Sequence, residues 1–265
     1  MNAIKSLSII AALAVSFAAC SKKEDNKTTT PTPNPTPTDT ATVGKVGFEF
    51  SHKAGSADLV MTTGNYTNAA GESFTVTKFT YYITNIKMIK ADGSEYAEPE
   101  SYHLIEGDVA STHHFHMNSV PKGSYKGISF LIGVDSTRNV SGAQTGALDP
   151  AKGMFWTWNT GYIMAKVEGT SPVATSTDKK FVHHIGGFTG GNSGVKKVTI
   201  MFPQNMDVSA AKELSVLLNT DILKWFSPST ISIASNTNIM SVGMTSAAIA
   251  SNYANMITLN AAKYE

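Results

Sequence analysis

Hydrophobic and polar residues alternate along much of the chain beyond residue 43, which is the pattern of half-buried β-strands. Val46, Phe48 and Phe50 share one face of the first such segment. Residues 74–89 are dense in β-branched and aromatic side chains, and Asp92-Gly93 after them is typical of a hairpin turn. Further strands are predicted at residues 59–61, 102–105, 112–117, 125–134, 195–202 and 214–218.

Helical patterns are rare. The best lies at residues 245–256, where Thr245 or Ser246 is the expected N-cap. Many short strands separated by turn residues predict a mainly β fold, an antiparallel β-sandwich with long loops and a short C-terminal helix. Residues 135–153 lack periodicity, and loops of that length are often functional.

The first residues have the pattern of an export signal. Lys5 precedes an apolar run that is too short to span a membrane, so residues 1–19 are predicted to be a signal peptide. Small residues stand directly before Cys20 and resemble a bacterial lipobox, which implies that Cys20 becomes the lipid-carrying N-terminus. Residues 20–42 are then a lipidated cysteine and a Thr/Pro-rich extended tether. Residues 43–265 form a single β domain.

The expected location is the outer membrane, with the lipoprotein on its periplasmic or cell-surface face and the N-terminal lipid in the membrane. The charged cluster of residues 22–25 is similar to the surface-export signals of Bacteroidetes lipoproteins. Because Cys20 is the sole cysteine, intramolecular disulfides are excluded and the core must hold the fold.

Charge and motifs exclude several functions. The net charge is +1 and basic residues are scattered, so no nucleic-acid partner is expected. The sequence has no G-x-S-x-G nucleophile elbow, and no carboxylate pair stands out for glycoside hydrolysis. We therefore expect a protein that is not an enzyme.

Two tryptophans and two histidines are the most informative candidate site residues. On an extended strand, Trp156 and Trp158 would point to one face. A histidine on a nearby strand would add a nitrogen ligand beside this aromatic wall, which suits metal binding better than acid–base catalysis. His183 and His184 must point to opposite faces of a strand, and residue parity does not decide which one is buried. The alternative interpretation is that both indoles belong to the core.

A second histidine group offers another metal-binding pattern. His114 and His116 share one strand face, and such a pair can bind copper or zinc. A solvated strand face is the simpler interpretation of this pair. His52 and His103 have no local partner in sequence.

Other candidate ligands have simpler explanations. Met154 and Met164 are candidate soft ligands for Cu(I), although core filling explains them more simply. Asp135, Asn139 and Asp149 lie in one loop that could bind Ca²⁺, but turn formation explains them as well.

Several motifs together resemble the MbnP-like copper-binding proteins, in particular their lipoprotein branch in Bacteroidetes. The most specific is M-x-W-x-W-x-x-G-Y at residues 154–162. The other matching segments occur in the family's order, at residues 81–86, 92–93, 120–125, 130–135, 146–150, 168–169 and 184–187.

This resemblance implies an exported copper-binding β-protein that acts in copper acquisition or storage. Some members use a tryptophan oxidised to kynurenine as a ligand beside histidine, and a di-haem, peroxidase-like partner performs the oxidation. A TonB-type transporter is a further expected partner. Carried onto this chain, the resemblance implies Trp156 or Trp158 as the modified residue and His184 as the histidine, with His114, His116 or His52 to complete the site.

The chain also departs from the family pattern. Members in methane-oxidising bacteria often have cysteines in the domain, and residues 43–265 have none. Those members tend to carry histidine where Val140 stands here. The alternative function is a non-catalytic envelope binding or adhesion module for carbohydrate or protein, in which the tryptophan motif is structural.

Overall fold

The computed structural model describes residues 42–142, 144–158 and 161–265. The predicted signal peptide, Cys20 and all but the last residue of the predicted tether lie outside these residues. No helix in the described part is long and apolar enough to cross a membrane.

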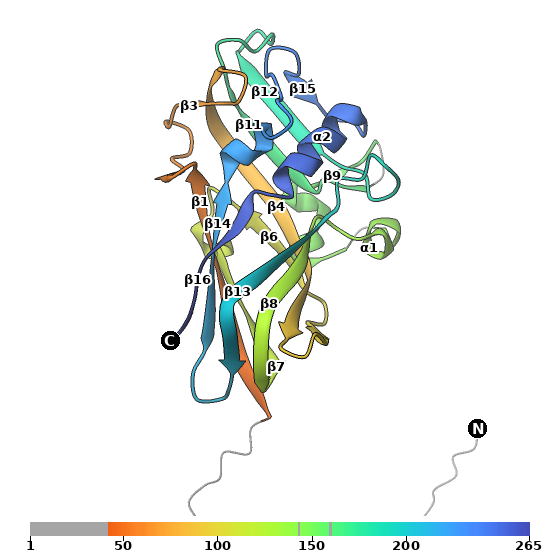
Figure 1. The fold of residues 1–265 in the computed structure, drawn as a ribbon. Coiled ribbons are helices and arrows are strands. Elements are labelled where there is room, and N and C mark those ends of the chain that lie inside the picture. The colour runs from red at the N-terminus through yellow and green to blue at the C-terminus, as the bar shows by residue number, and fades with distance from the viewer. Residues whose placement is uncertain (1–41, 143, 159–160) are drawn as a thin grey trace, which may run out of the picture. The chain divides into compact units, whose positions relative to one another are not determined.

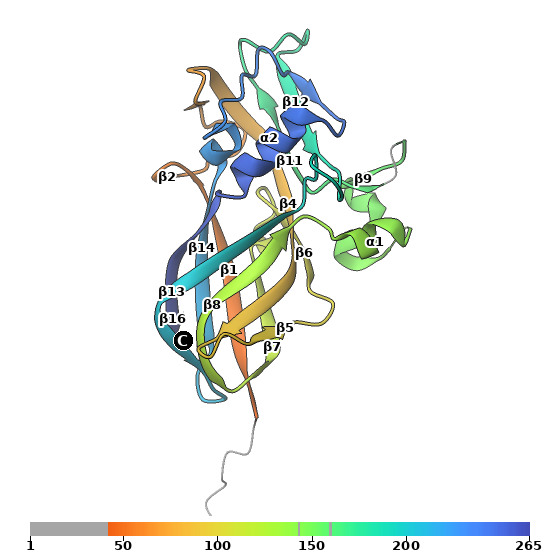
Figure 2. The ribbon, with the colours of Figure 1, turned by 45° about the vertical axis from the view of Figure 1, so that its right-hand side comes forward.

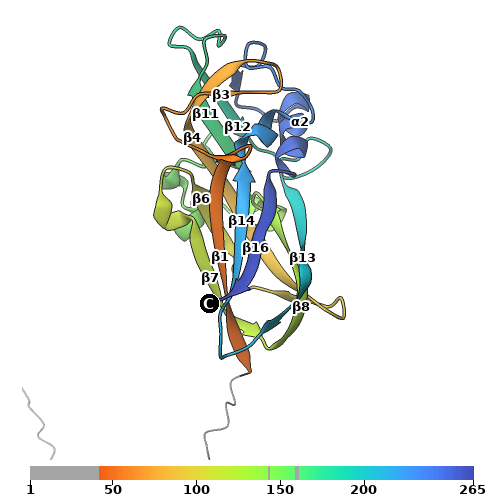
Figure 3. The same ribbon diagram turned by 60° about the vertical axis from the view of Figure 1, so that its left-hand side comes forward.

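The domain is built from two facing β-sheets (Figure 1), which confirms the predicted mainly β, sandwich-type fold. The first sheet, seen in Figure 3, has the order β16 (Ile257–Tyr264), β14 (Leu214–Asp221), β1 (Val43–Ala54). Both β2 (Ala57–Asp58) and β7 (His114–Pro121) pair with β1. Because β1 and β14 are parallel, this sheet is mixed and not purely antiparallel.

The second sheet is centred on the long strand β4 (Ser73–Lys90). Its order is β13 (Lys196–Val208), β8 (Gly123–Ile132), β4, β11 (Ala165–Thr170), β12 (Lys180–Ile185), β15 (Asn238–Ile239). Three short strands also pair with β4, namely β3 (Tyr66–Thr67), β5 (Glu95–Ala97) and β6 (Tyr102–Glu106). A separate ribbon consists of β9 (Phe155–Trp156) and β10 (Gly161–Tyr162).

Short helices and 3₁₀ turns connect the strands. The α-helices are α1 (Ser136–Val140) and α2 (Met244–Tyr253). The 3₁₀ turns are η1 (Ala110–Thr112), η2 (Gly146–Leu148), η3 (Pro150–Lys152) and η4 (Ile222–Phe226). The predicted C-terminal helix is therefore confirmed. Its N-cap is Gly243, because Ser246 is the third helical residue and its hydroxyl accepts from the Gly243 N–H at 2.8 Å.

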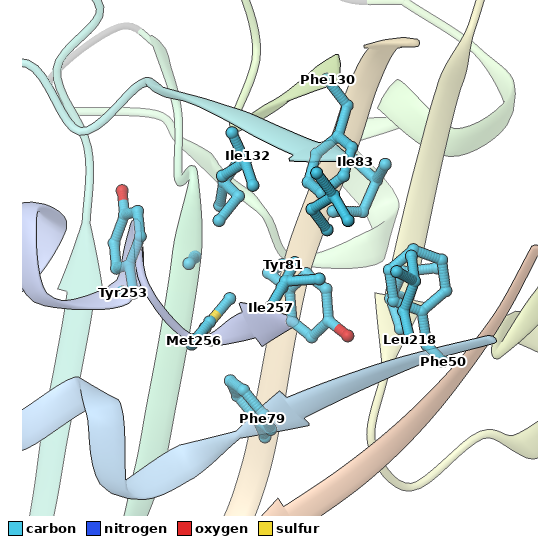
Figure 4. Packing of buried hydrophobic residues seen from close by; sticks show 14 of the residues in the cluster. Phe50, Phe79, Tyr81, Ile83, Phe130, Ile132, Leu218, Tyr253, Met256 and Ile257 are labelled. Atoms are coloured by element: carbon cyan, nitrogen blue, oxygen red, sulfur yellow. The ribbon is translucent and has the colours of Figure 1, made fainter. Parts of the chain in front are cut away.

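The main core lies between the two sheets (Figure 4). Phe50 and Leu218 from the first sheet meet Phe79, Tyr81 and Ile83 of β4, and all of these side chains are at most 2% exposed. The period-two alternation recognised in the sequence supplies these inward positions.

Two predicted strands need correction. Residues 59–61 are not a strand, because the chain turns there and the Tyr66 hydroxyl accepts from the Val60 N–H at 2.6 Å. The strand predicted at residues 112–117 begins only at His114, since the preceding residues form η1.

At Tyr82, the strand that pairs with one edge of β4 changes from β11 to β8, and we call this point the fork. On this edge β11 pairs with β4 up to Tyr81, and β8 pairs with it from Ile83 onward. Between them, the Tyr82 N–H donates to the Met164 carbonyl and the Tyr82 carbonyl accepts from the Gly133 N–H, both at 3.1 Å. The segment between β8 and β11 leaves the sheet at this fork. Figure 2 shows its elements α1 and β9 on the far side of β4 from β14 and β16.

Gly133 makes the fork possible, because its φ is +112° and an added Cβ would lie 2.9 Å from the Met164 sulfur. We expect Gly133→Ala to destabilise the protein by about 1–3 kcal/mol through backbone strain, with a further cost from that contact. Gly142→Ala is the matched control, since Gly142 has φ +80° and open space around it. Urea unfolding should show the larger loss for Gly133→Ala, and equal losses would contradict a tightly packed fork.

Candidate metal centre

A second apolar cluster covers the outer face of the forked sheet. Tyr82 and Leu104 come from the sheet itself, and the rest of the cluster comes from the segment between β8 and β11. These covering residues are Val134, Leu148, Met154, Trp156, Tyr162, Ile163 and Met164. The outer face at the fork is therefore buried rather than solvated.

Asn139 ties this covering segment together. Its side-chain oxygen accepts from the Tyr162 N–H at 2.9 Å, and its amide nitrogen donates to the Val134 and Asp135 carbonyls. Asp135 caps α1, and Asp149 caps η3. These contacts match the turn-forming interpretation of the three residues.

The two tryptophans of the motif lie in different environments. Strand β9 ends at Trp156, so the predicted extended strand through Trp158 is wrong. Trp156 is 1% exposed whereas Trp158 is 65% exposed, although their ring centroids are 6.2 Å apart. A turn after Trp156 separates the buried indole from the exposed one.

His183 is a core residue. Its Nδ1 accepts from the Trp225 indole N–H at 3.1 Å, and its Nε2 donates to the Asn236 carbonyl at 2.5 Å. Burial lowers the pKa of His183 to about 4, which keeps the ring neutral in this network. Residue parity left open which of His183 and His184 is buried, and the structure shows that it is His183.

His184 lies on the opposite, outer face of β12. Its Nε2 is 2.8 Å from the Glu168 carboxylate, and this hydrogen bond holds the pKa of Glu168 below its usual value. Because an ionised carboxylate only accepts, Nε2 carries the proton and Nδ1 keeps its lone pair. That Nδ1 is buried and has no hydrogen-bond partner within the part of the chain that the structure describes.

Trp156 packs against Gly186, which lies just beyond the end of β12. Gly186 follows His184 by two residues, and a Cβ on Gly186 would lie 2.2 Å from the Trp156 ring. Strand alternation places Gly186 on the same side as His184. The Trp156 Nε1 is also buried without a partner. His184 Nδ1 and Trp156 Nε1 are thus two buried nitrogens without a hydrogen-bond partner among the described residues.

Lys166 is a neighbour of His184 that the sequence analysis did not identify. It stands opposite His184 in the β11–β12 ladder, and its ammonium donates to the Gly153 carbonyl at 3.2 Å. Burial lowers its pKa. Lys166 and Glu168 are two residues apart on β11, so strand alternation places both side chains on the outer face with His184. This spacing is the sequence signal that would have identified Lys166.

Comparison with protein-family models and with solved structures identifies proteins that are similar to this chain. The family model MbnP matches residues 43–241. The chain belongs to the MbnP family. The solved structure of MbnP from Methylosinus trichosporium is similar, with a TM-score of 0.52 and 15% sequence identity over 76% of this chain and 82% of that one. Comparison with curated protein sequences gives no match.

In this MbnP-family member, the other three candidate histidine ligands lie on the first sheet. His114 and His116 lie on β7 of the first sheet, exposed as predicted, with ring centroids 6.2 Å apart. His116 Nε2 is 3.1 Å from Glu213. His52 lies on β1 of the same sheet. The structure therefore does not place His114, His116 or His52 on the covered face that carries His184.

The soft sulfur ligands considered in the sequence are core residues here. Met154 and Met164 are both fully buried in the outer cluster, and the Met164 sulfur accepts from the Val134 N–H at 3.1 Å. Within the described residues, no three His, Cys, Asp or Glu side chains converge as ready ligands of one ion. Val140, where relatives tend to carry histidine, is 71% exposed.

One buried histidine, His183, and two half-buried ones, His52 and His103, make stability depend on pH. Burial lowers the pKa of His103 and His183 to about 4, and burial together with His113 lowers that of His52 to about 3. Between pH 6.5 and 4 the unfolded chain therefore binds more protons than the folded chain. The free energy of unfolding is therefore unaffected by these histidines above pH 6.5 and falls as the pH falls below it, by up to about 1.4 kcal/mol per pH unit for each histidine.

Urea unfolding of the metal-free protein across this pH range tests the prediction. His103→Phe removes one titrating ring while keeping a ring to stack on Phe115, whose centroid lies 3.6 Å from that of His103. We expect this variant to lose less stability on acidification than the parent protein. An identical loss in both proteins would refute the contribution of His103.

Proposed function

We propose that this protein is an exported, lipid-anchored copper-binding protein of the cell envelope, without catalytic activity, that acts in copper acquisition or storage. The proposal assigns the metal centre to His184 and to Trp156 or a kynurenine derived from it. The observation that carries it is the pair of buried, unpartnered nitrogens, His184 Nδ1 and Trp156 Nε1. Membership of the MbnP family supports copper as the ion.

The histidine fits a metal ligand. Imidazole is a preferred ligand of copper. Metal-binding histidines commonly donate their second ring nitrogen to a carboxylate, which fixes the tautomer and ring orientation. Glu168 accepts in this way from His184 Nε2 at 2.8 Å. The free Nδ1 lone pair is the atom left for an ion.

The tryptophan fits only after chemical change. An indole nitrogen is a hydrogen-bond donor without an available lone pair, so intact Trp156 cannot coordinate copper through Nε1. Oxidative opening to kynurenine would turn this nitrogen into an aromatic amine with a lone pair. Trp158, at the surface and 6.2 Å from Trp156 between ring centroids, offers a contact point for the peroxidase-like partner.

The binding or adhesion alternative has less support. Of the three tryptophans, Trp156 and Trp225 are buried, so Trp158 alone is exposed and no pair of side-by-side indoles is available for sugar stacking. A purely structural tryptophan motif would not require a histidine with an unpaired buried nitrogen on the same face.

Copper titration tests the ligand assignment. We expect His184→Ala to weaken copper binding at this site at least tenfold, because it removes the ligand nitrogen. Glu168→Gln should weaken it about tenfold to a hundredfold, the usual effect of losing an outer-shell partner. Val140→Ala, at an exposed position of the same covering segment, is the control and should leave the affinity unchanged. Binding that His184→Ala does not alter would sink the assignment.

Intact-mass measurement on natively expressed protein tests the tryptophan modification. Conversion to kynurenine replaces one ring carbon by oxygen, so the mass rises by the difference between these two atoms. We expect fragment spectra to place the change at Trp156. Modification at Trp158, or an unmodified protein that binds copper with full affinity, would contradict this part of the proposal.

A further inference from the structure

A groove of about 650 Å³ runs along β1 and the segment leading into β7, on the sheet that does not carry His184. Four imidazoles and four carboxylates line it, and its lining includes no lysine or arginine. These side chains are His52, His113, His114, His116, Glu49, Asp58, Glu213 and Glu265. Three of the carboxylates pair with lysines, namely Glu213 with Lys45, Asp58 with Lys53 and Glu265 with Lys263. The groove therefore offers a cation its imidazole nitrogens rather than a net negative charge.

Two of the histidines meet at one place in this groove. His52 lies near the end of β1, and His113 follows η1 directly before β7. Their ring centroids are 4.6 Å apart and the rings are inclined at 73°. The Phe50 N–H donates to the His113 carbonyl at 2.8 Å, which fixes the backbone beside the pair. Two segments distant in sequence thus hold two imidazoles in contact.

Hydrogen bonds engage Nε2 on both rings, which leaves Nδ1 as the second nitrogen of each. His113 Nε2 donates to the Glu106 carbonyl at 2.8 Å, so its Nδ1 carries the lone pair. His52 Nε2 is 3.1 Å from the Tyr81 hydroxyl, which is itself 2.9 Å from the Thr220 hydroxyl. Neither Nδ1 is among the buried atoms that lack a partner.

We propose that His52 and His113 form a second metal site, distinct from that of His184, which binds a divalent transition ion such as Zn²⁺ or Cu²⁺ through both Nδ1 atoms. Imidazole suits both ions. The Glu106 carbonyl and the Tyr81 hydroxyl are the outer partners that orient the two rings.

Two protein ligands leave positions for water or for a carboxylate of the groove. Asp58 is one such carboxylate, because it lines the same groove and stands opposite Lys53, the residue that follows His52 on β1. Lys53 pairs with Asp58 in the metal-free protein, so recruitment of this carboxylate requires a side-chain movement. This requirement agrees with the absence of three converged ligands among the described residues.

Equilibrium dialysis with Zn²⁺ tests the second site in a His184→Ala background, so that the result is independent of the proposed copper centre. We expect one equivalent of Zn²⁺ to remain bound. His113→Gln should weaken it at least tenfold, because glutamine can still donate to the Glu106 carbonyl but has no ring nitrogen. His113 is only partly buried, and a thermal melt verifies that this variant is folded.

The matched control is the double variant His114→Ala/His116→Ala, which removes the exposed pair from the same groove. It should keep the bound Zn²⁺. Loss of Zn²⁺ from this control with retention in His113→Gln would assign binding to the exposed strand face and overturn the proposal. Absence of any bound Zn²⁺ in the His184→Ala protein would overturn it as well.

Discussion

Burial of β4 on both faces is the constraint on which the rest of the domain depends. Residues 79–84 are all buried, although a strand at the surface of a sandwich normally alternates between core and solvent. The first sheet covers the inner face with Phe50 and Leu218. The outer face needs a second cover, and the segment between β8 and β11 provides it. The fork at Tyr82 lets this segment leave and re-enter the sheet where the cover is needed.

The candidate centre follows from this two-sided burial. A histidine on the outer face of a sandwich would ordinarily be solvated, and its nitrogens would bond to water. Here His184 Nδ1 and Trp156 Nε1 are buried and have no partner among the described residues. Each buried group without a partner costs about 1–3 kcal/mol. A ligand that satisfies such groups returns this free energy to the folded state, so binding and stability are coupled.

Sequence alone predicted the parts of the fold that are governed by local periodicity. The alternation in β1 and β14 comes from one face that meets a single core, so it is visible in the residues. The choice between His183 and His184 was not visible, because both faces of β12 are covered and neither is plainly polar. Resemblance to the MbnP family, rather than periodicity, indicated His184. The contact between His52 and His113 depends on the pairing of β1 with β7, which local patterns do not encode.

The parallel ladder between β1 and β14 has a kinetic consequence. As the chain is made from its N-terminus, β1 is among the first strands to appear, but its neighbour in the sheet is complete only at Asp221. Contacts between such distant segments form slowly, because a long loop must close before they stabilise anything. The edge of β1 that pairs with β14 therefore has no partner strand until most of the polypeptide has been synthesised. During this interval the nascent chain remains a substrate for chaperones rather than a folded domain.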